Sequence, residues 1–265
     1  MAVLMALSDV MGTRIASLGS GSKGNATLIA SCEALIMVDG GLGIRDTTAR
    51  MAQLGITPDE LDAIVLTHEH GDHIRGVKSL ARRYGTPVYG TAGTWLGGKL
   101  NDIASYRFIV PEQCFSIADI DIDPITVPHD AREPIQFVIS AGQHRIGLLT
   151  DLGHITAHVR QRFTGCDALF LECNHDLRML AEGPYPPMLK RRVGGHWGHL
   201  ANTQAKALLE FWGTDRLQHI VASHLSEKNN RPELAFDALR PLLDGAEERL
   251  HIASQTHGLE WQRVR

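Results

Sequence analysis

The sequence predicts a single α/β domain built from two halves that are each rich in β-strands. In both halves of the 265 residues, short runs of Val, Ile and Leu alternate with segments whose apolar residues recur at helical spacing. No segment rich in Pro, Gly and Ser separates the halves, so one mixed domain fits better than two independent ones. We expect residues 1–12 to be an N-terminal extension and residues 13–265 to form the domain.

The first half opens with three strands and then alternates strands with helices. Its strands are short apolar runs bounded by turn residues, and its helices carry apolar residues three and four positions apart. Strands are predicted at 14–18, 26–30, 34–38, 63–67 and 87–89, and helices at 44–54 and 74–84.

The second half is rich in strands at first, and helices return after residue 150. A stretch at 183–199 is rich in Gly and Pro and is predicted to be an irregular loop, of a kind that is often functional. Strands are predicted at 117–127, 135–140, 145–150, 168–172, 219–223 and 258–261, and helices at 155–163, 202–212 and 232–243.

Composition excludes several classes of protein. The formal net charge is −4, so we do not expect a broadly basic surface that coats nucleic acid. No apolar run reaches the ~18–20 residues that a membrane span needs, and the first residues lack the pattern of a signal peptide. The four cysteines form no CxxC pair, which favours free thiols in a reducing compartment. We therefore expect a cytoplasmic protein with no membrane contact.

Histidine is the unusual residue of the composition, with 14 occurrences. The predicted strand at 63–67 runs directly into the sequence HEHGDH at 68–73. Residues two apart on an extended segment project to the same side, so His68 and His70 can share one metal ion. Gly71 allows a tight turn, after which Asp72 and His73 face a second position. Imidazole and carboxylate ligands suit zinc, iron or manganese.

Three more residues of ligand type directly follow predicted strands: His129, Asp151 and His224. Functional residues of α/β folds collect at strand ends. A single residue in such a place is more often part of an ordinary turn, but the recurrence after several strands favours one shared site. Asp39, which follows the strand at 34–38, is expected to orient a ligand histidine.

Taken together, these residues resemble the metallo-β-lactamase fold superfamily, over about residues 13 to 261. The resemblance implies an αββα sandwich, in which two mixed β-sheets are flanked by helices and a binuclear metal site lies at one edge. It further implies two divalent metal ions per chain, which are Zn, Mn or Fe. The implied ligands are His68, His70 and His129 for one ion, Asp72, His73 and His224 for the other, and Asp151 as a bridge.

Eight short blocks narrow the resemblance to metallo-hydrolases of the YycJ/WalJ type. Members of that type are described as single-domain phosphodiesterases with exonuclease-like action on DNA, so DNA is the expected substrate. Cys173 departs from the pattern because serine is expected there, and this small change leaves the metal ligands alone. The blocks lie at 17–25, 67–76, 128–131, 150–153, 172–176, 183–187, 198–202 and 223–230.

The ligands alone do not select a substrate. A two-metal site that holds a bridging hydroxide can hydrolyse phosphodiesters, and also lactones, thioesters and β-lactams. The usual metal-binding cysteine of β-lactamases is absent, and residues 74–76 resemble the nuclease-like branch more closely. The hypothesis is therefore an exonuclease-like phosphodiesterase that acts on DNA. The alternatives are a small-molecule hydrolase, either a cyclic phosphodiesterase or a lactonase, and a non-catalytic scaffold that retains the fold.

Residues outside the ligand set are candidates for substrate binding. Lys23 and Asn25 lie in a glycine-rich loop at 19–25, which is either a phosphate contact or a plain tight turn. Lys190 and Arg191 belong to a basic run at 190–192 with Tyr185 nearby. That run predicts phosphate contacts and one stacking ring, or only a solvated basic face.

Protonation of the leaving group requires a donor. His199 precedes a predicted helix and His175 follows a predicted strand, and these two are preferred over His196. Asp72 is the carboxylate whose loss should abolish turnover. The sequence does not indicate an oligomeric state.

Overall fold

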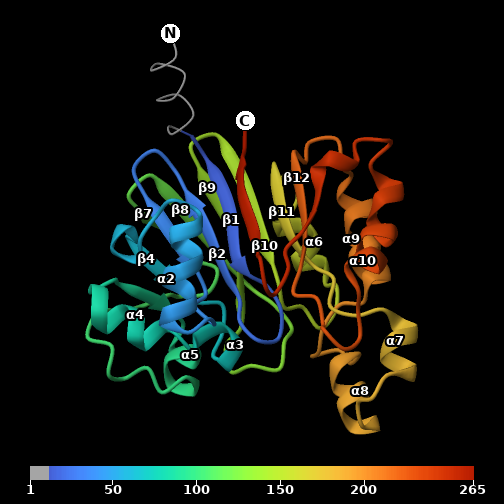
Figure 1. The fold of residues 1–265 in the computed structure, drawn as a ribbon, viewed down its shortest axis with the longest axis horizontal. Coiled ribbons are helices and arrows are strands. Elements are labelled where there is room, and N and C mark those ends of the chain that lie inside the picture. The colour runs from blue at the N-terminus through green and yellow to red at the C-terminus, as the bar shows by residue number, and fades with distance from the viewer. Residues whose placement is uncertain (1–11) are drawn as a thin grey trace.

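The computed structural model describes residues 12–265, so residues 1–11 of the expected N-terminal extension lie outside the described residues. Within the described part, two seven-stranded β-sheets pack face to face and helices cover both outer faces (Figure 1). Sheet A has the strand order β14-β1-β2-β3-β4-β5-β6, and sheet B has the order β13-β12-β11-β10-β9-β8-β7. The αββα sandwich with two mixed sheets is confirmed.

The strands of sheet A come from both ends of the described chain, and those of sheet B come from its second half. Sheet A contains β1 (Arg14–Gly19), β2 (Ala26–Ala30), β3 (Leu35–Val38), β4 (Ala63–Val65), β5 (Val88–Gly90), β6 (Tyr106–Phe108) and β14 (Leu259–Arg263). Sheet B contains β7 (Phe115–Ile117), β8 (Ile120–Thr126), β9 (Ile135–Ala141), β10 (His144–Leu149), β11 (Ala168–Glu172), β12 (His219–Ser223) and β13 (Leu250–Ile252).

Helices of the first half cover sheet A and helices of the second half cover sheet B (Figure 1). The first set is α2 (Ile44–Gln53), α3 (Gly71–Ile74), α4 (Val77–Tyr84) and α5 (Ala92–Gly97). The second set is α6 (Ala157–Arg162), α7 (Leu177–Glu182), α8 (Pro187–Val193), α9 (Asn202–Trp212) and α10 (Pro232–Leu239). Three short 3₁₀ helices lie at Pro58–Glu60, Arg240–Leu242 and Glu247–Arg249.

The core has three apolar layers because successive side chains of a strand point to opposite faces of the sheet. In β3, Ile36 and Val38 lie between the two sheets, whereas Met37 packs under the helices that cover sheet A. In β11, Phe170 lies between the sheets and Leu169 faces the helices that cover sheet B. Strands buried on both faces read as continuous apolar runs, which is why the sequence predicts most of them.

Strand direction brings the candidate ligands to one edge of the sandwich. In sheet B, β10, β11 and β12 are parallel, and β8 runs the same way because β9 is antiparallel to both of its neighbours. In sheet A, β3 and β4 are parallel. The carboxyl ends of these strands lie opposite the end that carries the N-terminus in Figure 1.

Several predicted elements differ from the structure. The predicted strand at 117–127 is two strands, because Ala118 has a φ of 49° and turns the chain between paired residues Ile117 and Ile120. The predicted helix at 74–84 begins only at Val77, after the short α3. Helix α10 ends at Leu239 and continues as a 3₁₀ turn. The stretch at 183–199 is not wholly irregular, since it contains α8.

The short outer strands β6 and β13 and the short helices α5 and α7 have no counterpart among the predicted elements, and β7 shares only Ile117 with the predicted strand at 117–127. Each contains three to six residues, which is too few for a periodic pattern to stand out. Among residues 12–265, no helix is both long and apolar enough to cross a membrane.

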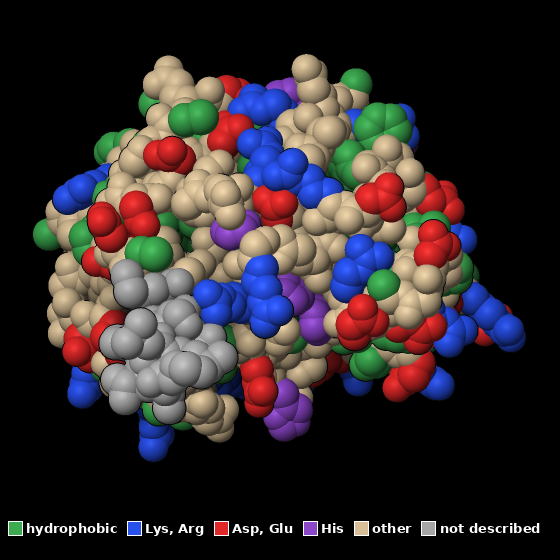
Figure 2. Space-filling model, turned by 90° about the horizontal axis from the view of Figure 1, so that it is seen from above, with side chains coloured by type: hydrophobic (Ala, Val, Ile, Leu, Met, Phe, Trp, Pro, Cys, Tyr) green, Lys and Arg blue, Asp and Glu red, His purple; other side chains and the backbone are tan. Residues whose placement is uncertain are grey.

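Figure 2 looks down on the end of the molecule that carries the N-terminus, opposite the ligand-bearing edge. On this face, acidic and basic side chains are interspersed and hydrophobic side chains are scattered among them. A continuous basic surface is therefore not present on this face.

Candidate metal centre

The predicted ligands come together at the shared edge of the two sheets. His68 lies three residues after β4, and His70 is the residue before α3. His129 follows β8, and Asp151 follows β10. His224 directly follows β12 and has a φ of 54°. Such a positive φ costs roughly 1–3 kcal/mol in a non-glycine residue, so the surrounding contacts must hold His224 in place.

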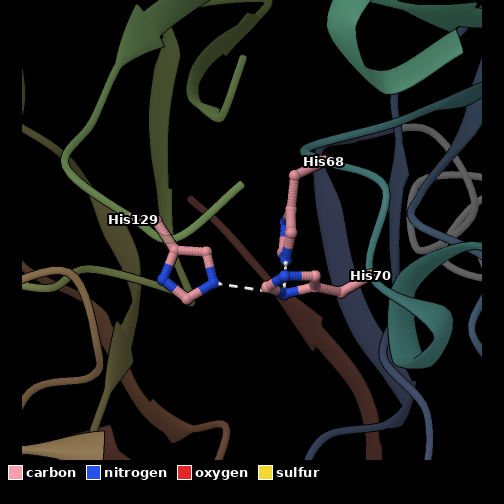
Figure 3. Close-up of side chains that lie close together, drawn as sticks. All are labelled: His68, His70 and His129. Carbon is pink, nitrogen blue, oxygen red and sulfur yellow. Dashed lines mark hydrogen bonds between the residues drawn. The ribbon is translucent and has the colours of Figure 1, made fainter. Parts of the chain in front are cut away.

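His68, His70 and His129, which we call the histidine group, place three ring nitrogens together (Figure 3). His68 Nε2 lies 3.0 Å from His70 Nδ1, and His129 Nε2 lies 3.3 Å from the same atom. Zinc–nitrogen bonds of ~2.0–2.1 Å in a tetrahedral site give a nitrogen–nitrogen separation of about 3.3 Å. The spacing of these nitrogens therefore fits one shared divalent ion.

Asp72, His73 and His224, which we call the carboxylate group, lie beside the histidine group. Asp72 Oδ2 lies 3.5 Å from His73 Nε2 and 3.5 Å from His224 Nε2. The two histidines are buried, and the Asp72 side chain is partly open to a pocket. One oxygen and two nitrogens thus face a common point.

Asp151 lies between the two groups. Its Oδ2 is 3.2 Å from His73 Nε2, and its Oδ1 is 3.3 Å from His224 Nδ1 and 3.7 Å from His129 Nε2. The residue is buried, yet Oδ2 has no hydrogen-bond partner among the described residues. A buried carboxylate oxygen without a partner is costly unless a cation completes its surroundings. This atom fits a bridging ligand.

A shell of polar side chains supports the carboxylate group from behind. Asp39, with a φ of 62°, accepts hydrogen bonds from the backbone N–H and the hydroxyl of Thr67. His73 Nδ1 lies 2.8 Å from Asp39 Oδ2, and the same Thr67 hydroxyl lies 2.9 Å from His68 Nδ1. Asp39 therefore reaches one histidine directly and another through Thr67.

Asn25 is buried against the same group. Its side-chain amide nitrogen lies 3.1 Å from His73 Nε2, and its backbone N–H donates to the carbonyl oxygen of Asp72 at 2.8 Å. Gly41 lies in the same contact, since a Cβ on it would lie 1.6 Å from that carbonyl oxygen. Only glycine fits there, so the pair Gly40-Gly41 after Asp39 was a sequence signal of this close approach.

Glu172 is a site residue that the sequence reasoning missed. It is fully buried at the end of β11, and its Oε1 lies 2.8 Å from His199 Nδ1 and 3.0 Å from His224 Nδ1. Its Oε2 accepts the backbone N–H groups of Leu152 and Leu200. The available signal was a carboxylate that ends an otherwise apolar, fully buried strand. Because both oxygens are engaged, Glu172 is suited to orienting histidines.

Burial and neighbouring charges separate the histidines into two classes. Burial lowers the pKa of His68 well below its ordinary value and also lowers that of His129. Burial would lower the pKa of His73 as well, but the carboxylates around it, Asp151 first, raise it well above its ordinary value. The same balance raises the pKa of His224 to about 10. The carboxylates in and around the carboxylate group thus favour a positive charge at this position, on the imidazoles or on a bound cation.

The two candidate proton donors are placed differently. His199 is partly exposed, lines the pocket over the ligand groups, and holds its Nδ1 against Glu172. His175 is buried behind this layer, and burial lowers its pKa to about 4. It is not among the residues that line the pocket. The structure therefore brings His199, but not His175, to the edge of the candidate centre.

The pocket itself has a volume of about 300 Å³ and opens over both ligand groups. Its floor contains side chains of the ligand groups, and one wall is formed by α8 and the loop that follows it. The lining residues are Ser22, His70, Gly71, Asp72, Asp130, Asp151, Leu189, Arg192, Val193, Gly198, His199 and His224.

The residues predicted to bind substrate do not all reach this pocket. From the basic run, Arg192 lines it and pairs with Asp130 at 2.5 Å, whereas Lys190 donates to the carbonyl of Ala181 instead. Arg191 is exposed and does not line the pocket.

Tyr185 is half-buried and is also absent from the lining residues. Lys23 is exposed and pairs with Glu227, while its neighbour Ser22 lines the pocket. Consecutive residues of a helix point about 100° apart, so a basic run does not reveal from sequence which member faces a site.

Comparisons with known proteins agree with this architecture. Residues 35–220 match the model of the Beta-lactamase superfamily domain. The chain is 34% identical to Exodeoxyribonuclease YycJ of Bacillus anthracis over 88% of this chain and 90% of that protein. It is also 34% identical to Exodeoxyribonuclease WalJ of Streptococcus pneumoniae serotype 2, over 85% and 86% of the two chains.

Among solved structures, the metallo-β-lactamase fold protein YhfI of Bacillus subtilis superposes with a TM-score of 0.72 at 18% identity. The match covers 94% of this chain and 98% of that one. A diphosphatase from the PhnP family superposes with a TM-score of 0.67, also at 18% identity, over 96% and 98% of the two chains. At such identity these likenesses concern the fold.

Proposed function

This chain belongs to the β-lactamase superfamily domain family, and from that premise we propose that it is a two-metal phosphodiesterase that acts on the ends of DNA. The observation that carries the proposal is the convergence of seven ligand-type side chains at one pocket. The relatives named as exodeoxyribonucleases support the choice of DNA as substrate. The complete ligand set argues against a scaffold without catalytic activity.

Two divalent ions fit the donor sets described above. We assign the histidine group to one ion, the carboxylate group to the other, and Asp151 to both. Nitrogen and oxygen donors without a thiolate suit zinc, manganese or iron. Ions bound there would polarise a phosphoryl oxygen and activate water for attack on phosphorus.

The chain supplies the orientation of these ligands. Asp39 and Glu172 each accept from a histidine Nδ1, which fixes the ring and leaves Nε2 for the centre. Asn25, which the sequence suggests as a phosphate contact, is buried beside His73 and acts instead as a positioning residue.

His199 is the proposed proton donor to the leaving oxygen. Glu172 accepts its Nδ1–H, so Nε2 remains the nitrogen that is available to the pocket. The contact with Glu172 also fixes the orientation of the ring, as a general acid requires. Arg192 is the proposed phosphate contact because it lines the pocket and carries a cationic guanidinium.

Localisation follows from the same proposal. A DNA substrate and four free cysteines, of which Cys32 and Cys114 are exposed, are consistent with a reducing cytoplasm.

The test combines metal analysis with a substrate panel. Purified protein loaded with Mn²⁺ or Zn²⁺ should contain about two ions per chain and release nucleotides from single-stranded or double-stranded DNA. Asp72→Ala should lower the rate to that of buffer, because it removes the oxygen shared by His73 and His224. The matched control is Asp102→Ala, which removes an exposed carboxylate paired with Lys78 and should leave the rate unchanged.

Two results would overturn the proposal. Protein that contains metal but leaves both DNA and bis-p-nitrophenyl phosphate intact is not a phosphodiesterase. Hydrolysis of bis-p-nitrophenyl phosphate without any cleavage of DNA would instead favour a small-molecule phosphodiesterase.

A further inference from the structure

Ser22 lies in the glycine-rich loop between β1 and β2 and lines the pocket over the ligand groups. The residue is exposed. Among residues 12–265, neither its hydroxyl nor its backbone N–H has a hydrogen-bond partner. Two neutral donors of one residue are therefore free to bind a molecule that enters the pocket.

The loop uses its other backbone N–H groups to hold its own shape. Gly24 N–H donates to the carbonyl oxygen of Gly21 at 3.1 Å, which closes a β-turn with Ser22 and Lys23 at its centre. Within residues 20–25, Ser22 is the residue whose N–H is left over, and it is also the residue that lines the pocket. The remaining N–H groups donate to Ser254 O from Ser20, to Asn25 Oδ1 from Gly21, to Gln255 Oε1 from Lys23 and to Asp72 O from Asn25.

Gln255 clamps this turn from the loop between β13 and β14. Its Oε1 accepts the backbone N–H of Lys23 at 2.7 Å, and its Nε2 donates to the carbonyl oxygen of Gly24 at 2.9 Å. Its own carbonyl oxygen accepts the guanidinium of Arg50 at 2.9 Å. Gly21 has a φ of 144°, and a Cβ there would lie 2.8 Å from Gln255 Oε1, so the turn fits closely against the carboxamide. The donors of Ser22 are thus held in place before any ligand binds.

The two ends of the same loop are tied to the carboxylate group. Ser20 Oγ accepts the backbone N–H of His224 at 2.7 Å. The backbone N–H of Asn25 donates to the carbonyl oxygen of Asp72 at 2.8 Å. Ser22 lies two and three residues from these anchors, so its position is fixed relative to two of the residues assigned to one ion.

The surroundings of Ser22 suit a phosphate better than a free cation would suggest. Asp72 and Asp151 line the same pocket, and Arg192 enters it from α8, where it pairs with Asp130 beside the histidine group. A hydroxyl and a backbone N–H bind phosphate oxygens without carrying a charge, so neighbouring carboxylates do not neutralise them. A neutral donor on the side of Asp72 thus complements the guanidinium on the side of the histidine group.

Resting on the proposed function, we propose that the hydroxyl and the backbone N–H of Ser22 donate to a non-bridging oxygen of the phosphodiester that is cleaved. Gln255 is the positioning residue that holds the turn for this contact. Because the contact is with phosphate and not with a base, it is independent of sequence. The loop between β1 and β2 therefore binds the reacting group through Ser22, while the neighbouring Lys23 and Asn25 do not.

The first test uses metal-loaded enzyme with bis-p-nitrophenyl phosphate and with duplex DNA. Ser22→Ala should raise KM for both substrates about 10-fold, the effect of one hydrogen bond to a charged group, with kcat changed far less. Ser22→Thr keeps the hydroxyl and should restore most of the affinity. The matched control is Ser79→Ala, which removes an exposed hydroxyl on α4 outside the pocket and should leave KM unchanged.

Binding of inorganic phosphate gives a readout apart from turnover. Isothermal titration calorimetry should show about 10-fold weaker binding of phosphate to Ser22→Ala than to wild-type enzyme at equal metal content. Lys23→Ala distinguishes donors from charge, because the Lys23 ammonium pairs with Glu227 and does not line the pocket. If Lys23→Ala weakened phosphate binding as much as Ser22→Ala, the charge of the loop and not Ser22 would be the phosphate contact.

Gln255→Leu tests the positioning role. The substitution removes both hydrogen bonds to the turn at similar side-chain volume, so the amides of Lys23 and Gly24 should exchange faster with deuterated water. It should also raise KM more than it lowers kcat. Ser22→Ala combined with Gln255→Leu should be no worse than the more affected single variant, because both act on one contact. Additive effects on KM would refute a role for Gln255 through Ser22.

The two proposals fail in different ways. If metal-loaded wild-type enzyme hydrolyses neither bis-p-nitrophenyl phosphate nor DNA, the proposed function fails and this inference fails with it. If wild-type enzyme is active but Ser22→Ala keeps both KM and phosphate affinity within about twofold, only the role of Ser22 is refuted.

Discussion

The histidine group and the carboxylate group lie side by side at one edge of the sandwich, but the chain holds them in different ways. In the histidine group, the atoms that contact the Nδ1 nitrogens of His68 and His129 belong to neutral groups. His68 Nδ1 lies 2.9 Å from the hydroxyl of Thr67, and His129 Nδ1 lies 3.0 Å from the carbonyl oxygen of Gly198. In the carboxylate group, both histidines bear directly on carboxylates. His73 lies against Asp39 at 2.8 Å, which gives that ring a negatively charged support.

This difference indicates that the histidines of the two groups are prepared for metal binding in different ways. Imidazoles whose pKa is lowered by burial are neutral and present free electron pairs, as a metal ligand must. Imidazoles pressed against carboxylates are fixed in orientation and made more basic, so they act as stronger donors. The carboxylate group therefore depends on its supporting shell more than the histidine group does, and that dependence can be tested.

The largest expected effect comes from the residue that both groups share. Asp151→Ala should lower phosphodiester hydrolysis to background and reduce bound metal from about two ions to about one per chain. Because Asp151 also separates buried histidines from one another, Asp151→Asn is the variant that preserves packing and should lose activity equally. Elemental analysis and circular dichroism together check this. Wild-type metal content in a folded, inactive Asp151→Asn would show that Asp151 is not a ligand.

Glu172 should give the next largest effect. Glu172→Gln replaces the charge behind His224 and His199 and should weaken metal binding or turnover by about 10- to 100-fold. Chelator competition measures the affinity, which a merely structural change would not alter.

The matched control for Glu172 is Asp167→Asn. Asp167 is also a largely buried carboxylate of sheet B, but it accepts from Arg216 and from the backbone of Arg145 at the far end of β11. Its loss should lower stability by about 1–3 kcal/mol and leave metal affinity unchanged. Equal effects of the two substitutions on metal affinity would remove the distinction between the two carboxylates.

Glu172 also shows which contacts of the site could not be predicted from the sequence. The sequence HEHGDH places four candidate ligands within six residues, so local spacing was sufficient to find them. Glu172 meets His199 and His224 only after β11 and β12 have paired, 27 and 52 residues apart along the chain. No local sequence pattern predicts these contacts. The only sequence signal was a charged residue at the end of a buried apolar strand.

The fold was predictable for a different reason. Strands such as β3 and β11 are buried on both faces, so their apolar runs are visible in the sequence. Edge strand β6 has two exposed residues among its three, and α8 has no buried residue at all. Such elements are stabilised by the segments that pack beside them, and their own sequences lack a visible apolar pattern. The same lack of burial in α8 explains why sequence favoured Arg191 where packing places Arg192 at the pocket.

A smaller effect is expected when the neutral support of the histidine group is removed. Thr67→Val keeps the shape of the side chain but removes the hydroxyl that lies against His68 and Asp39. The loss of one hydrogen bond of ~1 kcal/mol should weaken metal binding about fivefold, less than Glu172→Gln does. Chelator competition compares the two variants. If Thr67→Val were the more harmful, the order of dependence between the two groups would be reversed.

Arg192 should give the smallest change, and one that concerns substrate more than metal. The guanidinium pairs with Asp130, whose Oδ1 lies 3.5 Å from His129 Nε2 and 3.8 Å from His70 Nε2. Arg192→Ala should raise KM for DNA about threefold and lower the salt dependence of binding by about one phosphate contact, since an exposed ion pair contributes under ~1 kcal/mol.

Arg191→Ala is the control, because it removes the same charge from the same helix without touching the pocket. Unchanged KM there, with a raised KM in Arg192→Ala, would identify position and not net charge as the cause. Metal affinity should stay at the wild-type value in both variants if Asp130 is only a neighbour of the histidine group. A gain in metal affinity on loss of Arg192 would mean that Arg192 holds a carboxylate away from the histidine group. In that case the ion pair between Arg192 and Asp130 would be what keeps a carboxylate from supporting the histidine group as carboxylates support His73 and His224.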